Sequence, residues 1–264
     1  MSTAEHGPIT CKNCQTTFDG KFCPNCSQKA DTHRLTVAHF GHEVFHAFTH
    51  TDRGVLLLMK ELLYRPGKVA FEYNSGFRKK YFNPITFLLI ITAIQIFASK
   101  KTDTFAKVGL ATQQITRQLI DPDTEEGKKI LEQSFKDTSK QVSVVEENNK
   151  AFTLLLIPML AFFSWLLFKK SGHNYAENLV LHVLISGGTS LLFFVTFLAP
   201  LLLLPSLIVL WMGMSLIIGV VYNIVAYKQF FNQGWGITIF KGLVMQLVMV
   251  VFSQVLTTLL VKIV

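Results

Sequence analysis

The sequence predicts an all-α polytopic membrane protein of about five transmembrane helices, with a small N-terminal head of zinc-ribbon-like β knuckles. Half of the residues are hydrophobic and only 16% are charged, whereas soluble domains carry about 25% charged residues. From Asn178 to the C-terminus there is no Asp or Glu. All four cysteines stand near the N-terminus, in two C-x2-C pairs. The apolar body predicts the membrane helices, and the paired cysteines predict the head.

Five apolar segments are long enough to cross a bilayer, whose hydrocarbon core of about 30 Å needs roughly 20 residues of helix. We expect a first transmembrane helix at 84–99 and a four-helix transmembrane bundle over 151–264. Within that bundle, Pro200 and Pro205 bracket a short apolar stretch. Because proline interrupts helices, we predict a tight helical hairpin there. The predicted spans are 82–99, 151–168, 178–199, 204–227 and 236–263.

Basic residues next to the predicted spans set the orientation, because Lys and Arg are enriched in cytoplasmic loops. Arg78, Lys79 and Lys80 precede the first span, and Lys169, Lys170 and Lys228 follow the second and fourth. A cytoplasmic N-terminus and an extracytoplasmic C-terminus satisfy all of them. The same flanks account for the net charge of +8, and the basic residues are too dispersed for a nucleic-acid site. The expected partner is therefore the lipid bilayer, with no nucleic acid.

The segment 100–150 falls outside the membrane in this orientation. Acidic residues and a proline between Asp121 and Glu126 are typical of a helix start, with Pro122 at the first helical position. Ile130, Leu131 and Phe135 follow at helical spacing. One hypothesis is an extracytoplasmic subdomain of one or two amphipathic helices, and the other is a solvated spacer.

The cysteine pairs point to one structural zinc ion in a head at 1–30. Cys11, Cys14, Cys23 and Cys26 supply four thiolates, the ligand set of a closed tetrahedral zinc site. The segment is too short and polar to fold on an apolar core, so metal binding would supply its folding free energy. Two disulfides are the alternative, which a reducing cytoplasm disfavours. A redox role lacks the thioredoxin-like context that such a motif needs.

Three residues are expected to shape the turns of the head. Asn13 and Asn25 occupy equivalent positions in the two knuckles, and Asn tolerates the left-handed backbone of a tight turn. Gly20 stands between the knuckles and favours a hairpin there. The sequence therefore predicts left-handed residues inside both C-x2-C turns.

A histidine stripe follows the head: His39, His42, His46 and His50 fall on one face of a predicted helix. His42, Glu43 and His46 also form an H-E-x-x-H pattern, which can place two imidazoles on a metal with the glutamate as general base. The extended pattern with a third histidine is absent. Three hypotheses stand: a polar, pH-sensitive face of an interfacial helix, a second metal site, and a hydrolase with these three residues as catalytic candidates.

Residues 31–83 are predicted to form cytoplasmic juxtamembrane amphipathic helices. A second helix is expected over 54–64, ended by Arg65, Pro66 and Gly67. The segment 68–81 then carries aromatic and basic residues up to the first span, as membrane anchors do. Arg78, Lys79 and Lys80 are candidate contacts for anionic lipid headgroups.

These motifs resemble those of the DUF3667 family of membrane proteins of unknown activity. The resemblance rests on the two knuckles, the histidine-rich helix, Arg65-Pro66-Gly67-Lys68, and residues 76–84 with their Gly-Phe-Arg-Lys-Lys-Tyr-Phe-Asn-Pro sequence. Two departures are Phe77 and Ser27, where the family often has Lys and Gly. The resemblance covers 11–90 and implies a bacterial plasma (inner) membrane protein, with no active site carried over.

Three classes of function remain. The first is a non-enzymatic adaptor, assembly or membrane-organising factor that binds a protein partner through the head or the 100–150 loop. The second is a transporter or lipid-handling protein that uses the C-terminal spans. Those spans lack Asp and Glu, and their small-residue run at 186–190 is typical either of close helix packing or of a flexible break. The third is an H-E-x-x-H membrane metallohydrolase.

Overall fold

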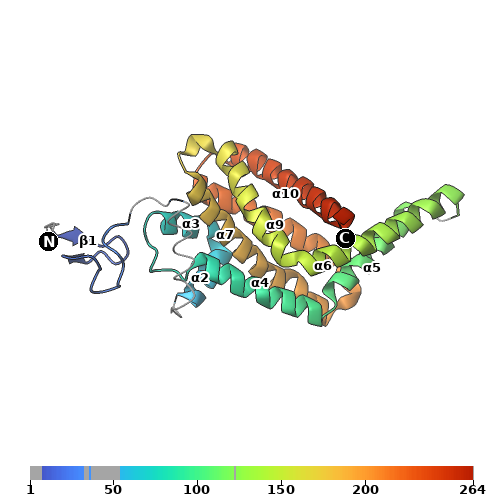
Figure 1. Ribbon diagram of the computed structural model, residues 1–264, viewed down its shortest axis with the longest axis horizontal. Coiled ribbons are helices and arrows are strands. Elements are labelled where there is room, and N and C mark those ends of the chain that lie inside the picture. Colours follow the sequence, from blue (N-terminus) through green and yellow to red (C-terminus); the bar gives the residue numbers. More distant parts are fainter. Residues whose placement is uncertain (1–7, 33–35, 37–53, 122, 264) are drawn as a thin grey trace.

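The computed structural model describes residues 8–32, 36, 54–121 and 123–263. Within these residues the protein is mostly helical, and the N-terminal head consists of two short strands, turns and loops. Figure 1 shows an elongated molecule in three parts. The head lies at one end, a helical body occupies the middle, and a two-helix hairpin projects from the opposite end.

Five helices of the described chain build the body, which we call the membrane body. They pack as α4 on α7, α6 on α7 and α10, and α9 on α7 and α10. The chain passes back and forth between the two ends, so the N-terminal head and the C-terminus lie on opposite sides (Figure 1). The helices are α4 (Pro84–Lys101), α6 (Glu125–Leu167), α7 (Tyr175–Phe193), α9 (Ile208–Phe231) and α10 (Trp235–Ile263).

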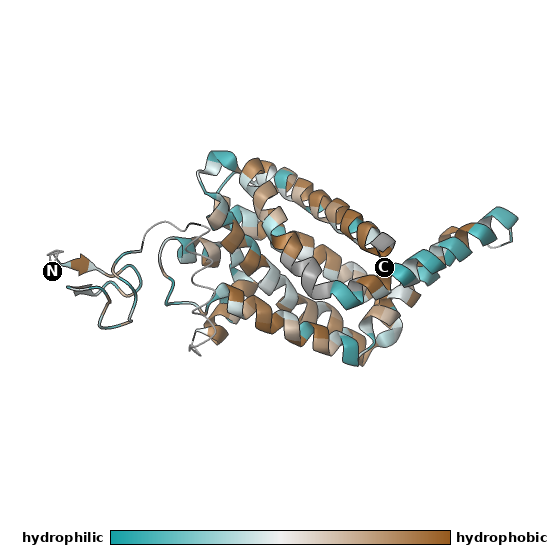
Figure 2. Cartoon of the chain, in the orientation of Figure 1, coloured by the Kyte–Doolittle hydropathy of each residue, from teal (hydrophilic) through white to brown (hydrophobic). Residues whose placement is uncertain are grey.

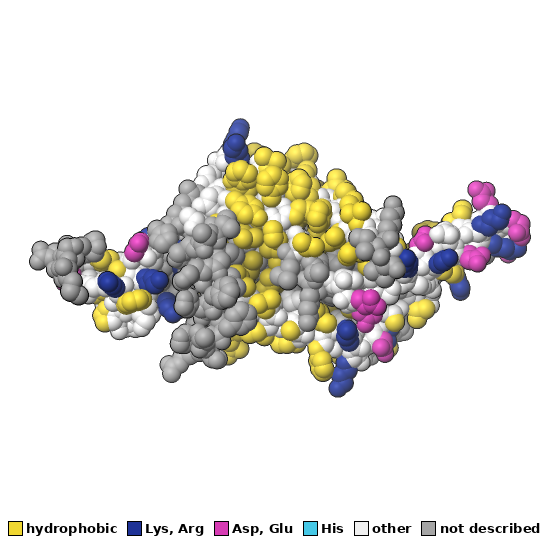
Figure 3. Space-filling view, in the orientation of Figure 1, with side chains coloured by type: hydrophobic (Ala, Val, Ile, Leu, Met, Phe, Trp, Pro, Cys, Tyr) yellow, Lys and Arg dark blue, Asp and Glu magenta, His cyan; other side chains and the backbone are white. Residues whose placement is uncertain are grey.

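Four helical segments of the described chain are long and apolar enough to cross a membrane. They are Pro84–Lys101, Tyr175–Leu203, Pro205–Phe231 and Trp235–Val261. The second predicted span, 151–168, corresponds to a shorter apolar stretch, Leu155–Leu167, at the end of α6. Figure 2 shows the apolar body, and Figure 3 shows hydrophobic side chains gathered across the middle of the face in view. The prediction of a multi-pass helical membrane protein is therefore confirmed, with four segments rather than five meeting the length criterion.

The projecting hairpin consists of α5 (Thr104–Leu119) and the first half of α6. The segment 100–150 contains two helices, as one of the two hypotheses expected, and its extracytoplasmic location stays a prediction. Thr124 is the N-cap of α6, and its hydroxyl accepts a 3.0 Å hydrogen bond from the Gly127 N–H. The helix therefore starts at Glu125, and Pro122, the predicted first helical position, lies outside the described residues. It also continues without a break into the predicted second span, and Pro158 is the one proline inside it.

The hairpin between α7 and α9 differs from the expected proline-bracketed turn. Pro200 lies inside helix: a π-helical turn, η2 (Phe194–Leu198), leads into α8 (Ala199–Leu203). Proline cannot donate the hydrogen bond that an α-helix requires, and a local change of helical register absorbs this loss. The chain reverses only at Leu204, before the 3-10 turn η3 (Pro205–Leu207). The third span is therefore longer than predicted.

Two short helices cover the end of the membrane body that lies nearer the head. The predicted helix over 54–64 is found as α2 (Val55–Tyr64). As predicted, α2 ends at Tyr64, just before Arg65, Pro66 and Gly67. Pro66 also starts a further helix, α3 (Pro66–Asn74), where its missing N–H is no loss at the first helical position. Both helices pack on α7, and α3 also packs on α9. Leu58, Leu62 and Val69 are fully buried in this contact.

Glycines of α7 let two neighbouring helices approach closely. A Cβ atom on Gly187 would lie 2.8 Å from the ring of Phe87 in α4. One on Gly188 would lie 1.8 Å from the hydroxyl of Tyr222 in α9. The rings of Phe87 and Tyr222 thus pack directly against the small-residue run at 186–190. The geometry supports the packing hypothesis for this run over the flexible-break hypothesis.

Candidate metal site and its attachment to the membrane body

The head is built from two successive hairpins. Strands β1 (Ile9–Thr10) and β2 (Thr17–Phe18) pair antiparallel, with Ile9 opposite Phe18. An isolated antiparallel bridge between Phe22 and Lys29 closes the second hairpin. Each hairpin carries one C-x2-C pair at its tip. The sequence repeat therefore becomes a structural repeat that brings the two tips together.

The four cysteine side chains converge on one point. Their sulfur atoms all lie within 4.8 Å of one another, and Sγ–Sγ distances are 3.6 Å for Cys11–Cys26 and 3.5 Å for Cys14–Cys23. None of the four forms a disulfide. A tetrahedral zinc ion with bonds of about 2.3 Å needs sulfurs about 3.8 Å apart. The cluster could therefore hold one metal ion, and a soft four-thiolate set suits zinc.

The knuckle turns place the left-handed residues elsewhere than predicted. In the described chain, Gln15 and Ser27 have φ of +62° and +57°, whereas Asn13 and Asn25 have no positive φ. Each left-handed residue follows the second cysteine of its pair, where its N–H bonds back to the first cysteine's carbonyl. Glycine adopts a positive φ without strain, which explains why the resembled family often has Gly at the position of Ser27. Gly20, with φ of +118°, forms the predicted turn between the hairpins.

The environment changes the pKa of two of the thiols in opposite directions. Hydrogen bonds from the Thr16 side chain and backbone lower the pKa of Cys14 to about 6. Burial raises the pKa of Cys26 to about 12. Without a metal, the Cys14 thiol therefore ionises more readily than the Cys26 thiol. A bound cation would favour the thiolate form of the others.

A buried glutamine attaches the head to the membrane body. The Gln28 side chain donates a 2.6 Å hydrogen bond to the Gly76 carbonyl and accepts a 3.4 Å one from the Lys79 N–H. Its own carbonyl accepts from the N–H of Cys23 and so closes the second knuckle. Gln28 is only 3% exposed. Gln28 therefore joins the second cysteine knuckle to the loop before α4. We call this contact the Gln28 latch.

Beside that loop lies a group of five interacting side chains, which we call the charge cluster: Glu61, Arg65, Glu72, Lys80 and Tyr81. Arg65 pairs with Glu61 at 2.5 Å and with Glu72 at 3.0 Å. Lys80 pairs with Glu72 at 2.6 Å. The Tyr81 hydroxyl lies 2.5 Å from a Glu61 oxygen and 2.7 Å from a Glu72 oxygen. The charge cluster ties α2, α3 and the loop before α4 into one unit.

Ionisation in the charge cluster follows from these contacts. Burial opposes the charge of Glu72, but hydrogen bonds from Lys80 and Tyr81 outweigh it and lower the pKa of Glu72. Burial, reinforced by the two carboxylates, raises the pKa of Tyr81. Burial also disfavours the Arg65 cation, yet its pKa is raised by the bond to Glu61 and the nearby acidic groups. The cluster is therefore a stable set of paired charges around a neutral hydroxyl.

Helix α9 caps both helix ends at the junction of α2 and α3. The Tyr222 hydroxyl donates a 3.0 Å hydrogen bond to the Leu62 carbonyl near the end of α2. The Gln229 side-chain oxygen accepts from the N–H groups of Gly67, at 3.0 Å, and Lys68, at 3.4 Å, at the start of α3. Helix ends leave such groups without intrahelical partners. The junction is thus held against α9 by polar contacts as well as by packing.

The predicted lipid-contact residues have different environments. Lys79 is exposed, Arg78 is partly buried, and Lys80 is held in the charge cluster by Glu72. His39, His42, Glu43, His46 and His50 lie outside the described residues. The sequence reasoning missed Gln28 and most of the charge cluster. The i,i+4 spacing of Glu61 and Arg65 was the one available signal, because such pairs meet on a helix face.

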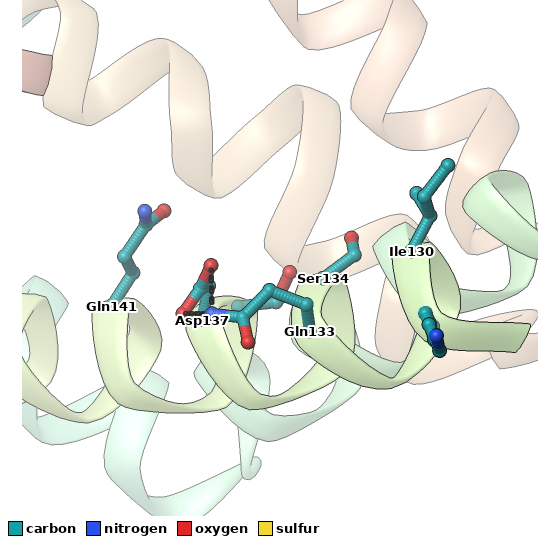
Figure 4. A pocket seen from close by; sticks show the side chains of 7 residues that line it. Ile130, Gln133, Ser134, Asp137 and Gln141 are labelled. Atoms are coloured by element: carbon teal, nitrogen blue, oxygen red, sulfur yellow. Dashed lines mark hydrogen bonds between the residues drawn. The ribbon is translucent and has the colours of Figure 1, made fainter. Parts of the chain in front are cut away.

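A shallow cavity of about 580 Å³ lies along the outer half of α6, between Lys129 and Gln141. Figure 4 shows Gln141, Ser134 and Ile130 pointing from this helix into it, and Gln133 bonded to Asp137 along the helix at 3.0 Å. Every described residue that lines it belongs to α6. A wall from a single helix brings no convergent set of reactive groups together, so we assign no site here.

The fold and the cysteine cluster define a multi-pass helical membrane protein with a four-cysteine head that could bind a metal ion. Residues 52–96 match the family model DUF3667, described as a protein of unknown function. This match confirms the family resemblance noted in the sequence. It spans α2, α3 and most of α4, including the charge cluster, and leaves the cysteines outside. No curated protein and no solved structure matches the chain.

Proposed function

We propose that the protein is a non-enzymatic membrane adaptor whose zinc-loaded head binds a protein partner at the cytoplasmic face of the bacterial plasma membrane. The Gln28 latch carries this proposal. A single buried side chain fixes the knuckle on the loop before α4, so the head is held at a set place on the membrane body. Such a fixed small module suits docking better than catalysis, because a closed four-thiolate site has no open coordination position.

Charge placement supports a cytoplasmic head. Lys169 and Lys170 form the short 3-10 turn η1 (Lys169–Ser171) between α6 and α7, at the same end of the membrane body as the head. Lys228 lies in the last turn of α9, also at that end. Lys and Arg favour the cytoplasmic side, and free thiols persist in a reducing compartment. This orientation leaves the α5–α6 hairpin and the C-terminus outside.

The proposal is tested by capture of partners from native membranes, cross-linked before solubilisation, with the intact head and with Cys23 and Cys26 both changed to Ser. We expect a defined protein partner with the intact chain and its loss with the double variant, at equal amounts of inserted protein. A chain that purifies alone in both forms overturns the adaptor function.

A second pair of variants separates the metal from the latch. Gln28→Ala removes the two side-chain bonds to the loop but leaves the four thiols, so we expect one zinc per chain and weakened capture. Lys29→Ala alters the exposed neighbouring residue and serves as the matched control, with capture unchanged. Equal capture by Gln28→Ala and Lys29→Ala would remove the latch as support for the proposal.

A further inference from the structure

The outward surface of α2 is apolar, although it faces away from the membrane body. Leu56 and Tyr64 are 74% and 76% exposed, while Leu58 and Leu62 on the opposite side are fully buried. At 100° per residue the exposed residues share an arc of about 120°. We call this arc the outer face of α2. Its residues are Leu56, Leu57, Lys60, Leu63 and Tyr64.

A helix with this pattern is poorly suited to water. Helices of soluble surfaces carry charged residues on the side that faces solvent, and a helix that is apolar all round is typical of a buried or membrane position. Lys60 is the one charged residue on the outer face. A lysine can extend its ammonium group to a polar boundary while its stem lies along apolar surroundings. The outer face therefore requires an apolar environment with a polar edge nearby.

The contacts of α2 with α9 place its C-terminal end within the thickness of the membrane. Tyr222, which bonds to the Leu62 carbonyl, lies about 13 Å from the head-side end of α9 at 1.5 Å per residue. The 24 residues of α9 extend over about 36 Å, only slightly more than the roughly 30 Å hydrocarbon core. Leu62 thus lies beside a part of α9 that is itself within the hydrocarbon.

The backbone at the junction of α2 and α3 meets the condition for such a position. Interrupted helices occur at membrane depth only where their polar groups find partners in the protein. Here the Glu61 carbonyl accepts from the Arg65 N–H, and α9 supplies Tyr222 to α2 and Gln229 to α3. The Arg65 guanidinium is likewise paired with two carboxylates. The junction therefore exposes little unsatisfied polarity to lipid.

We propose that the outer face of α2 is embedded in the head-side leaflet and contacts lipid acyl chains, with Lys60 reaching the phosphate level. Leu216, Ile217 and Val221 of α9 are likewise apolar and exposed, and they belong to a membrane-spanning segment. Residues 54–64 are then part of the membrane domain, not of a cytoplasmic linker.

Tryptophan fluorescence in lipid nanodiscs tests this placement. Leu56→Trp and Tyr64→Trp each add one indole on the outer face, and the emission of the parent chain, with its three tryptophans, is subtracted. The nanodiscs contain phosphatidylethanolamine and phosphatidylglycerol, with acyl chains either plain or brominated near the headgroup end. Phe22→Trp is the control, because Phe22 is 56% exposed on the head.

For both α2 variants we expect brominated acyl chains to quench the added emission about twofold or more, because the apolar face of an interfacial helix lies about 5–10 Å into the headgroup and acyl boundary. Iodide in the buffer should quench them little, and Phe22→Trp should show the reverse pattern. Quenching of the α2 variants by iodide at the level of Phe22→Trp overturns the proposal. Protection from both quenchers also overturns it, since the outer face would then be covered by protein, including a second copy.

Discussion

Gly188 of α7 and Tyr222 of α9 are in direct contact, and this contact controls how the membrane body meets α2. A Cβ atom at Gly188 would lie 1.8 Å from the Tyr222 hydroxyl. The same hydroxyl donates to the Leu62 carbonyl. Because Gly188 has no side chain, α7 leaves room for the Tyr222 ring of α9. The hydroxyl of that ring caps the C-terminal end of α2.

Gly188→Ala should therefore destabilise the protein. The added methyl forces Tyr222 to move, which breaks the cap on α2 and overpacks the contact between α7 and α9. Overpacking of this kind costs about 1–3 kcal/mol. We expect a lower midpoint in fluorescence-detected thermal unfolding in nanodiscs. Gly219→Ala on α9 is the matched control, since a Cβ there meets nothing within 4 Å. Equal midpoints for the two variants would contradict this packing.

Gly67→Ala should separate α3 from α9. A Cβ at Gly67 would lie 2.0 Å from the Ala226 carbonyl oxygen, and the Gly67 N–H is one of those capped by Gln229. Because backbone cannot yield as a flexible side chain can, we expect faster proteolysis between α2 and α4 in native membranes. Gly234→Ala, with open space around its Cβ, should be cleaved like the parent. Unchanged cleavage of Gly67→Ala would show that α3 is not held by α9 in this way.

The sequence was sufficient to predict features that depend on local patterns. The apolar segments predict the spans because their length is set by the bilayer, and the paired C-x2-C units predict the convergence of four sulfurs. The charge cluster could not be predicted, because Glu61, Glu72 and Tyr81 come from α2, α3 and the loop before α4 and meet only in the tertiary fold. The end of α2 before Pro66 was predicted, but the start of α3 at Pro66 was not, because the same residue can end one helix and start the next.

The head should depend on metal for its structure. Its described apolar cluster is small, formed by Cys11, Phe18 and Cys23 with a few partly buried neighbours, so folding free energy must come from the metal. We expect elemental analysis of the purified chain to give one zinc per chain, and about two if the histidine stripe also binds metal. A strong chelator should make the head sensitive to protease while the spans stay intact. Resistance of the metal-free head would contradict a structural role.

The hydrolase hypothesis has its own test in Glu43→Gln. This change removes the general base of an H-E-x-x-H site but leaves both imidazoles in place. Under the adaptor proposal we expect the cellular phenotype and partner capture to equal those of the parent. A phenotype equal to that of a deletion, at normal protein levels and zinc content, would favour catalysis instead.

Acid should weaken the unit formed by α2, α3 and the loop before α4 through Glu72. The pKa of Glu72 in the folded protein lies below its ordinary value of 4.5, because hydrogen bonds from Lys80 and Tyr81 favour the carboxylate. Its carboxylate therefore contributes stability that is complete above that value and is lost as the pH falls through the lowered folded pKa. Glu72→Gln should cost roughly 1.5–3 kcal/mol near neutral pH, the range for hydrogen bonds to charged groups. The variant and the parent should converge in stability as the pH falls below 4.5.

Glu125→Gln, at an exposed position on α6, is the control and should match the parent in stability across the whole pH range. A constant difference between Glu72→Gln and the parent at all pH values would show that the Glu72 charge does not stabilise this unit.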